Sequence, residues 1–219
     1  QGIIECASTY NTKIVGGDIV KSPMLFITVA MYGICQNPTL QRSLLKDEDL
    51  IGITGLTGLS KAGLELSKSQ DELPNLTEYN TQLFYNAHFR PQPKINEGKI
   101  LKELGSKCAM DISDGLFSDL NKMLIASQIS ATINSSCIPI HPEISKVFPN
   151  LDFEMVTNGG EDYEILFGIS ADKIDKLKSL LPDSHIIGKA CSGESGVIEL
   201  IKDGKTYKVN QFNGWDHFK

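Results

Sequence analysis

The sequence predicts an α+β fold, in which helices are combined with antiparallel strands. Short apolar segments typical of strands alternate along the chain with amphipathic segments typical of helices. Asp203-Gly204 separates two strand-like segments, 197–201 and 205–209, and this dipeptide is a strong signal for a two-residue hairpin turn. Because a hairpin joins antiparallel strands, we favour α+β over a doubly wound sheet.

The N-terminal part carries one helix signal and one strand signal. Residues 2–10 are weakly helical, and a turn follows at Gly16-Gly17-Asp18. Residues 24–34 are rich in Phe, Ile, Val and Thr in partial alternation, so we predict a strand there. Residues 40–49 are polar and irregular.

In the central part of the chain we expect strands that are followed by helices. The segment Arg90-Pro91-Gln92-Pro93 cannot form a helix and marks a connection before the next one. A further helix is indicated by apolar residues at spacings of three and four, namely Leu116, Phe117, Leu120, Met123 and Leu124. The other expected elements are a strand at 50–54, a helix at 58–67, a loop at 67–80, a helix at 96–104 and a strand at 106–110.

The C-terminal part continues the alternation. We expect a strand at 163–169, an amphipathic helix at 171–181 and a strand at 185–187, before the hairpin.

Composition narrows the possible functions. The chain has 219 residues, 41% of them hydrophobic, which is enough to bury a core. Its formal net charge of −6 argues against a nucleic-acid partner, which would need a basic surface. An acidic protein that binds a polyanion such as ATP usually does so through magnesium held by carboxylates.

Membrane and secreted proteins are disfavoured too. No apolar run reaches the roughly 18 residues that would cross a membrane. The five cysteines are widely spaced and contain no C-x-x-C pair, which indicates reduced thiols. We therefore expect a cytoplasmic protein without a membrane partner.

The first candidate for chemistry is Asp111-Ile112-Ser113-Asp114-Gly115, between a predicted strand and a predicted helix. Carboxylates at positions i and i+3 of such a turn can share divalent cations, and a helix N-terminus favours phosphate. The alternative is that Ser113 and Asp114 are ordinary helix-capping residues.

Two further clusters combine glycines with acids. In Gly16-Gly17-Asp18 the glycines allow a close approach to phosphate and Asp18 could bind a metal, although a plain tight turn is the simpler explanation of this motif taken alone. Residues 159–164 place two glycines before a group of carboxylates and a tyrosine, and the alternative there is a solvated loop.

Single residues carry less information. Arg42 could bind a phosphate or simply lie on the surface, and Trp215 could stack on a flat ligand or fill the core. The spacing of Gly55, Gly58 and Lys61 differs from that of a phosphate-binding P-loop. Phosphate chemistry in this chain must therefore depend on carboxylates and metal.

The order of five motifs resembles that of the thiamine-monophosphate kinase family. The motifs are Gly16-Gly17-Asp18, Arg90-Pro91, Asp111 to Gly115, Gly159 to Glu164 and Gly214 to Phe218. The resemblance implies the fold of the aminoimidazole-ribonucleotide synthetase superfamily. Residues 1–35 would be the end of an N-terminal domain that forms a dimer and binds metal and ATP, and residues 36–219 a complete C-terminal α+β domain.

The resemblance also implies the reaction, in which ATP phosphorylates thiamine monophosphate to thiamine diphosphate. Gly17, Asp18, Arg42 and Ser113 would contact ATP.

The remaining implied roles concern metal and substrate. Asp18, Asp111 and Asp114 would bind magnesium, so Asp111 and Asp114 are the expected catalytic residues. Glu161 and Trp215 would line the thiamine site. The whole protein is expected to be a homodimer.

The sequence departs from the family pattern in three places. Lys21 occupies a position where the family often has Arg. Leu59 lies in a glycine-rich stretch in which the family usually has an Asp close by. The family's N-terminal metal-binding segment is absent, so we expect that a preceding segment is missing and that this chain alone has little or no activity.

Two alternative functions remain open from the sequence. One is a sibling enzyme of the superfamily, such as selenophosphate synthetase, aminoimidazole-ribonucleotide synthetase or the hydrogenase-maturation dehydratase. The other is a non-catalytic nucleotide-binding module that kept the fold.

Overall fold

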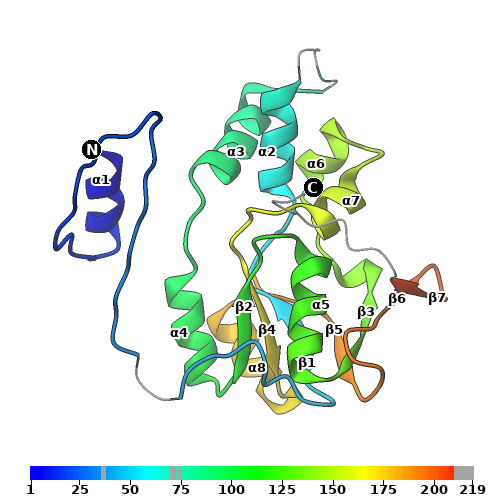
Figure 1. Cartoon of the computed structure of the whole chain (residues 1–219). Coiled ribbons are helices and arrows are strands. Elements are labelled where there is room, and N and C mark those ends of the chain that lie inside the picture. Colours follow the sequence, from blue (N-terminus) through cyan, green and yellow to red (C-terminus); the bar gives the residue numbers. More distant parts are fainter. Residues whose placement is uncertain (36–37, 70–72, 74, 210–219) are drawn as a thin grey trace. The chain divides into compact units, whose positions relative to one another are not determined.

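The computed structural model describes all residues except 36–37, 70–72, 74 and 210–219, and divides the chain into two units, 1–35 and 36–219 (Figure 1). The first unit contains α1 (Gly2–Thr9), which has no buried residue, followed by extended chain. That this unit is the end of an N-terminal domain stays a prediction.

The strand predicted at residues 24–34 is wrong. No strand is present in the described part of this segment, and the side chains of Phe26, Val29 and Tyr32 are exposed. A strand exists only where a neighbour accepts and donates its backbone hydrogen bonds. Residues with high strand propensity therefore form no strand here, because residues 1–35 contain no other strand that could pair with them.

The second unit is built on one seven-stranded sheet, which confirms the predicted α+β fold. Its order is β2-β4-β1-β5-β3-β6-β7, and every neighbouring pair is antiparallel except β3 with β6. The strands are β1 (Leu50–Ile53), β2 (Cys108–Asp111), β3 (Ser130–Asn134), β4 (Ile165–Ile169), β5 (His185–Cys191), β6 (Ile198–Lys202) and β7 (Lys205–Val209).

The helices of this unit are α2 (Leu59–Lys68), α3 (Glu78–Phe89), α4 (Ile95–Glu103), α5 (Leu116–Ser127), α6 (Pro142–Val147), α7 (Asp152–Asn158) and α8 (Ile174–Leu180), with short 3-10 turns at Ser135–Cys137 and Ala171–Lys173. Among the described residues, no helix is long and apolar enough to span a membrane.

Helices cover both faces of the sheet (Figure 1). Ile51 and Leu166 point to the face that packs against α5, α2 and α3, whereas Phe167 points to the face that packs against α4 and α8. This alternation follows from the two-residue period of a strand. The unit therefore has a core on each side of the sheet.

Most predicted elements between residues 50 and 209 are present within a few residues of their expected bounds, including the hairpin of β6 and β7. The sequence reading missed α3, β3, α6 and α7. The start of α3 shows why. The Thr77 side chain caps the helix, and the side-chain oxygen of Asn80 accepts the backbone N–H of Thr77 at 2.7 Å. Asn80 therefore takes the place of the Glu or Gln of the usual capping box.

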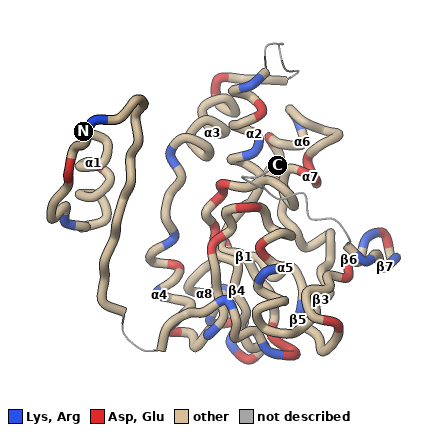
Figure 2. Tube along the Cα trace, viewed as in Figure 1, with Lys and Arg blue, Asp and Glu red and all other residues tan. Residues whose placement is uncertain are grey.

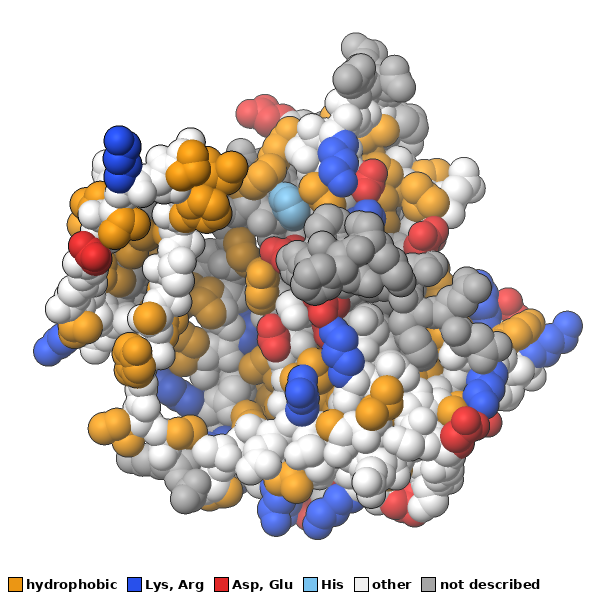
Figure 3. Space-filling model, viewed as in Figure 1, with side chains coloured by type: hydrophobic (Ala, Val, Ile, Leu, Met, Phe, Trp, Pro, Cys, Tyr) orange, Lys and Arg blue, Asp and Glu red, His pale blue; other side chains and the backbone are white. Residues whose placement is uncertain are grey.

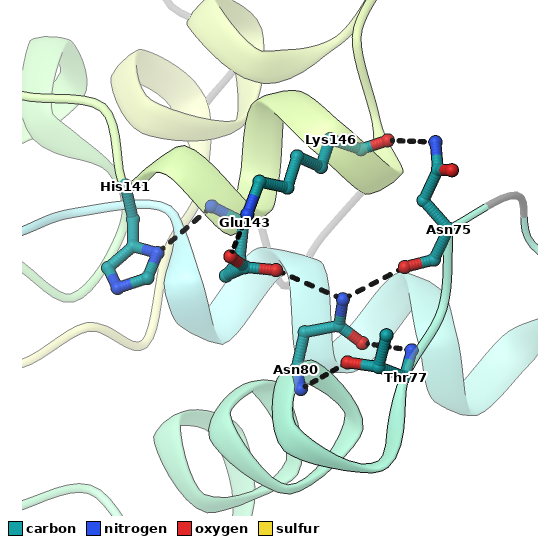
Figure 4. Close-up of polar contacts among 6 residues, drawn as sticks. All are labelled: Asn75, Thr77, Asn80, His141, Glu143 and Lys146. Atoms are coloured by element: carbon teal, nitrogen blue, oxygen red, sulfur yellow. Dashed lines mark hydrogen bonds and ion pairs between the residues drawn. The ribbon is translucent and has the colours of Figure 1, made fainter.

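Asn80 also links α3 to α6 (Figure 4). Its side-chain amide donates to the Glu143 carboxylate at 3.2 Å and to the backbone oxygen of Asn75 at 3.0 Å. Lys146 binds the second oxygen of Glu143 at 2.5 Å. α3 and α6 are therefore joined by polar contacts around the fully buried side chain of Asn80.

Candidate functional site

The turn at Asp111–Gly115 lies between the end of β2 and the start of α5, and it is bound to the loop that precedes β4. Tyr163 donates its backbone N–H to the oxygen of Ile112 at 2.9 Å, and Glu161 donates to the oxygen of Ser113 at 2.8 Å. Two motifs about fifty residues apart are therefore joined by main-chain hydrogen bonds.

Glycines allow these two segments to approach closely. A Cβ on Gly160 would lie 2.5 Å from the Ser113 oxygen, and one on Gly115 would lie 2.9 Å from the Asn158 oxygen. Gly115 also has a φ of +119°, which an L side chain rarely adopts. Gly115 and Gly160 are thus explained by the close approach of the two segments.

The loop before β4 holds two residues in the left-handed region. Glu161 has a φ of 66° and Tyr163 a φ of 54°. Such conformations cost about 1–3 kcal/mol each for residues other than glycine, and they cluster at functional sites. The hydrogen bonds to Ile112 and Ser113 hold the loop in this shape.

The predicted acids gather around Tyr163. Its hydroxyl donates to Glu161 at 3.0 Å. Burial raises the pKa of the Tyr163 phenol, and the hydrogen bond to Glu161 and the negative charges of Glu161, Asp111 and Asp114 raise it further. The acids of both motifs therefore act on one phenol, and the hydrogen bond from the Glu161 N–H to the Ser113 oxygen places Glu161 beside the turn that carries Asp111 and Asp114.

A buried acid supports the turn from within. Asp119 is fully buried in α5, and one of its oxygens accepts the backbone N–H groups of Ser113 and Asp114, both at 2.9 Å. Lys122 binds the other oxygen at 2.7 Å and also pairs with Asp114. Figure 2 shows acidic positions gathered in the loops near the start of α5, and Figure 3 shows acidic and basic side chains side by side on this face.

The capping interpretation of Ser113 and Asp114 is wrong. α5 begins after Gly115, with no side-chain cap hydrogen bond. The sequence reading also missed Asp119 and Lys122. A signal for Asp119 was present, because this acid stands directly beside Leu120 on the apolar helix face, where a charge needs partners.

A second acid of the loop stabilises another helix. Asp162 accepts the backbone N–H of Gly58 at 2.7 Å and that of Ser60 at 3.1 Å, where α2 begins. Burial raises the pKa of this carboxyl to about 7, although both N–H donors lower it and Glu164 adds a smaller upward effect. Asp162 therefore fixes the loop to the start of α2.

Two cavities lie beside Glu164. This buried side chain accepts the hydroxyl of Thr54 at 2.6 Å and pairs with Lys94 at 2.9 Å. One cavity, of about 500 Å³, extends toward α4 and α8, and the other, of about 460 Å³, extends toward α3 and contacts Arg90 and Pro91. The Arg-Pro motif thus lies at the rim of a cavity next to the acidic loop.

The structure does not place Gly17, Asp18 or Trp215 relative to this cluster, and it places Arg42 away from it. Gly17 and Asp18 belong to the unit of residues 1–35, which is described by itself. Trp215 lies outside the described residues. The backbone oxygen of Arg42 accepts the hydroxyl of Ser127, at the last residue of α5. A helix of 12 residues is about 18 Å long, so Arg42 lies far from the turn that precedes α5.

The carboxylates present suit magnesium, which prefers oxygen ligands and is usually held by one or two carboxylates together with substrate phosphates. Asp111 is exposed and Asp114 is partly exposed, so both can reach a hydrated cation. Within the described residues, no group of three or more His, Cys, Asp or Glu side chains could hold a metal ion. Further ligands would have to come from phosphates or from elsewhere in the protein.

Comparison with known sequences gives a consistent result. The family described as AIR synthase related protein, C-terminal domain, matches residues 44–201. The chain is 32% identical over its whole length to thiamine-monophosphate kinase of Bacillus subtilis, of which it covers 68%. It is 36% identical to the enzyme of the same name from Buchnera aphidicola subsp. Schizaphis graminum, again covering 68%.

Solved structures agree with the sequences. A structure named AaThiL complexed with AMPPCP and TMP is 30% identical, has a TM-score of 0.69, and matches 82% of this chain and 54% of its own. The hydrogenase maturation protein HypE of E. coli has a TM-score of 0.60 at 16% identity over 81% of this chain and 53% of its own, which shows a shared fold alone. The chain thus spans about two thirds of its curated relatives and about half of these solved chains.

Proposed function

The chain belongs to the thiamine-monophosphate kinase family, and on this premise we propose that it takes part in the ATP- and magnesium-dependent phosphorylation of thiamine monophosphate to thiamine diphosphate. Since the chain spans only part of its solved relatives, the activity is proposed for the whole protein. The solved relative AaThiL, complexed with AMPPCP and TMP, supports a nucleotide and a small phosphate ester as ligands.

The observation that carries this proposal is the joining of the turn at Asp111–Gly115 to the loop that contains Glu161. Phosphoryl transfer onto a phosphate brings two anions together, so the protein must position both and neutralise their charge. Asp111 and Asp114 would hold magnesium, which would supply that positive charge. The chain's own contribution is a pair of carboxylates, Asp111 and Asp114, on a turn whose backbone is held by Asp119, and we propose that Ser113 between them contacts the nucleotide.

The substrate side of the site is proposed from the neighbouring loop. Glu161, held in its left-handed conformation beside the turn, is our candidate for a contact with thiamine monophosphate. Trp215 would offer its ring to the thiazolium cation, a contact typically worth about 0.5–2 kcal/mol. Gly17, Asp18 and Arg42 remain proposed contacts to ATP, and Asp18 a third magnesium ligand, in the arrangement of the whole protein.

Partners and location follow the same proposal. We expect a homodimer that binds neither nucleic acid, given the net charge of −6, nor a membrane. The five cysteines are free in the structure, which supports a reducing compartment such as the cytoplasm.

The test measures thiamine diphosphate by chromatography after incubation with ATP, magnesium and thiamine monophosphate. It uses this chain and a version extended to the length of its relatives, which should be the active one. Product should disappear in Asp111→Asn and persist in Asp172→Asn, a matched change at an exposed acid on the turn before α8. A folded, ATP-binding protein that makes no product would instead indicate a sibling enzyme of the superfamily.

A further inference from the structure

Lys122 bridges two acids of different character. Its ammonium group lies 2.7 Å from Asp119 and forms an ion pair with Asp114. The Asp119 side chain is only 1% exposed, whereas that of Asp114 is 32% exposed and that of Lys122 39%. The same cation therefore serves one carboxylate that water cannot reach and one that is open to solvent.

The two carboxylates depend on Lys122 to different degrees. Asp119 is buried, and a buried carboxylate needs a permanent partner. It also accepts two backbone N–H groups, from Ser113 and Asp114, which fix its position. Asp114 is partly solvated and can exchange one cation for another without being left buried and unpaired.

We propose that Lys122 neutralises Asp114 when no divalent cation is bound, and that it releases Asp114 to magnesium while remaining on Asp119. This inference rests on the proposed function, which makes Asp114 a magnesium ligand. Cation binding at this turn is then an exchange, in which Mg²⁺ must compete with an ammonium group of the protein itself. No covalent step is involved, and Lys122 keeps its charge throughout.

The geometry makes such an exchange easy. Lys122 lies three residues after Asp119 on α5, so the pair with Asp119 stays intact when Asp114 turns away. Burial lowers the pKa of Lys122, but its hydrogen bonds to Asp114 and Asp119 outweigh burial and raise it. The competing group is therefore a full cation at neutral pH.

The test compares magnesium binding by isothermal titration calorimetry in wild type and Lys122→Met, without nucleotide and in the version extended to the length of its relatives, which can supply the further ligands. Removing the competitor should tighten binding roughly two- to fivefold, as expected for a partly exposed ion pair. Lys189→Met is the matched control and should leave magnesium binding unchanged. Lys189 pairs with exposed Glu48, at the end of β1 that lies away from the turn at Asp111–Gly115. Equal or weaker binding by Lys122→Met overturns the inference.

A double-mutant cycle separates this inference from the proposed function. In an Asp114→Asn background, Lys122→Met should have no effect on magnesium affinity, because the shared carboxylate is gone. If Asp114→Asn does not weaken binding, or if no variant binds magnesium, the metal assignment fails and the inference with it. If Asp114→Asn weakens binding and Lys122→Met changes nothing, only the exchange is wrong.

A measurement on the wild type covers the case in which Lys122→Met does not fold. In ¹⁵N-lysine NMR spectra, the Nζ resonance of Lys122, identified by its absence in Lys122→Arg, should move as magnesium is added. The Nζ resonance of Lys189 should not move. A Lys122 signal that stays fixed at saturating magnesium overturns the exchange.

Discussion

The buried carboxylate of Asp119 accepts the backbone N–H of Asp114 at a distance of 2.9 Å. The same oxygen accepts the N–H of Ser113, also at 2.9 Å. The turn that presents the proposed magnesium ligands is therefore fixed by a side chain from the following helix. An acid that cannot itself reach a ligand thus decides where the exposed acids lie.

We predict that Asp119→Ala lowers the free energy of unfolding by about 2–5 kcal/mol, since it leaves two backbone N–H groups without their acceptor and removes one of the two acids that pair with Lys122. Asp119→Asn should lose less, because its amide oxygen can still accept both N–H groups. Urea unfolding measures both values. A change below about 0.5 kcal/mol in Asp119→Ala, typical of a neutral surface substitution, would contradict the supporting role.

Gly160→Ala should separate the two joined loops. Its Cβ would lie 2.5 Å from the Ser113 oxygen, and a backbone atom cannot move aside without shifting the turn. We expect a loss of about 1–3 kcal/mol in unfolding free energy and weaker magnesium binding.

Gly98→Ala is the matched control for Gly160→Ala. The added methyl group would meet the Ile165 side chain at an ordinary 3.5 Å inside α4. Alanine is favoured over glycine in a helix, so we expect a gain of about 0.5–1 kcal/mol. Similar losses from both substitutions would show that the close contact of Gly160 is unimportant.

The raised pKa of Asp162 predicts that the free energy of unfolding depends on pH in a specific way. Burial raises the pKa of its carboxyl from 3.8 to about 7 in the folded protein. The folded state therefore binds more protons than the unfolded state between these values. The stability contributed by Asp162 is fully present below pH 4 and is lost as the pH rises through 7, by at most about 1.4 kcal/mol per pH unit.

Asp162→Asn removes this titration. When urea unfolding is measured from pH 4.5 to 7.5, the stability of wild type relative to Asp162→Asn should fall as the pH rises. The lowered pKa values of exposed Asp47 and Glu194 act in both proteins and cancel in the comparison. Parallel curves for the two proteins would refute the raised pKa of Asp162.

Asn80→Ala tests the polar contacts between α3 and α6 (Figure 4). The substitution leaves the Thr77 N–H without the Asn80 oxygen and the Glu143 carboxylate without the Asn80 amide. We expect a loss of about 1–3 kcal/mol in thermal or urea unfolding. Asn86→Ala, near the exposed end of the same helix, should change stability by less than about 0.5 kcal/mol.

Local patterns were sufficient for several elements. The spacing from Leu116 to Leu124 predicted α5, and Asp203-Gly204 predicted the hairpin of β6 and β7, because both signals come from residues that are close together in the sequence. The segment 24–34 shows the limit of such patterns. Its composition favours a strand, but pairing depends on a partner elsewhere in the protein, and residues 1–35 supply none.

The motifs of the site were found in the sequence, but their roles were not all apparent there. Asp162 stands next to Glu161, yet it accepts N–H groups at the start of α2 instead of facing the carboxylate cluster. Asp119 and Lys122 resemble ordinary helix residues until α5 is placed against the turn. The direction in which a side chain points, and whether it is buried, depend on how helices and strands pack against one another. Sequence spacing describes only the arrangement of residues within a single helix or strand.

The sequence by itself determined the α+β class, the presence of three glycine–acid motifs and the family that their order resembles. These features are local, or depend only on the order of residues. The tertiary structure decided that Glu161 lies beside the turn that carries Asp111 and Asp114, that Asp119 holds the turn, and that Lys122 pairs with the proposed metal ligand. Contacts between residues far apart in the chain form only when the sheet brings β2 and β4 side by side.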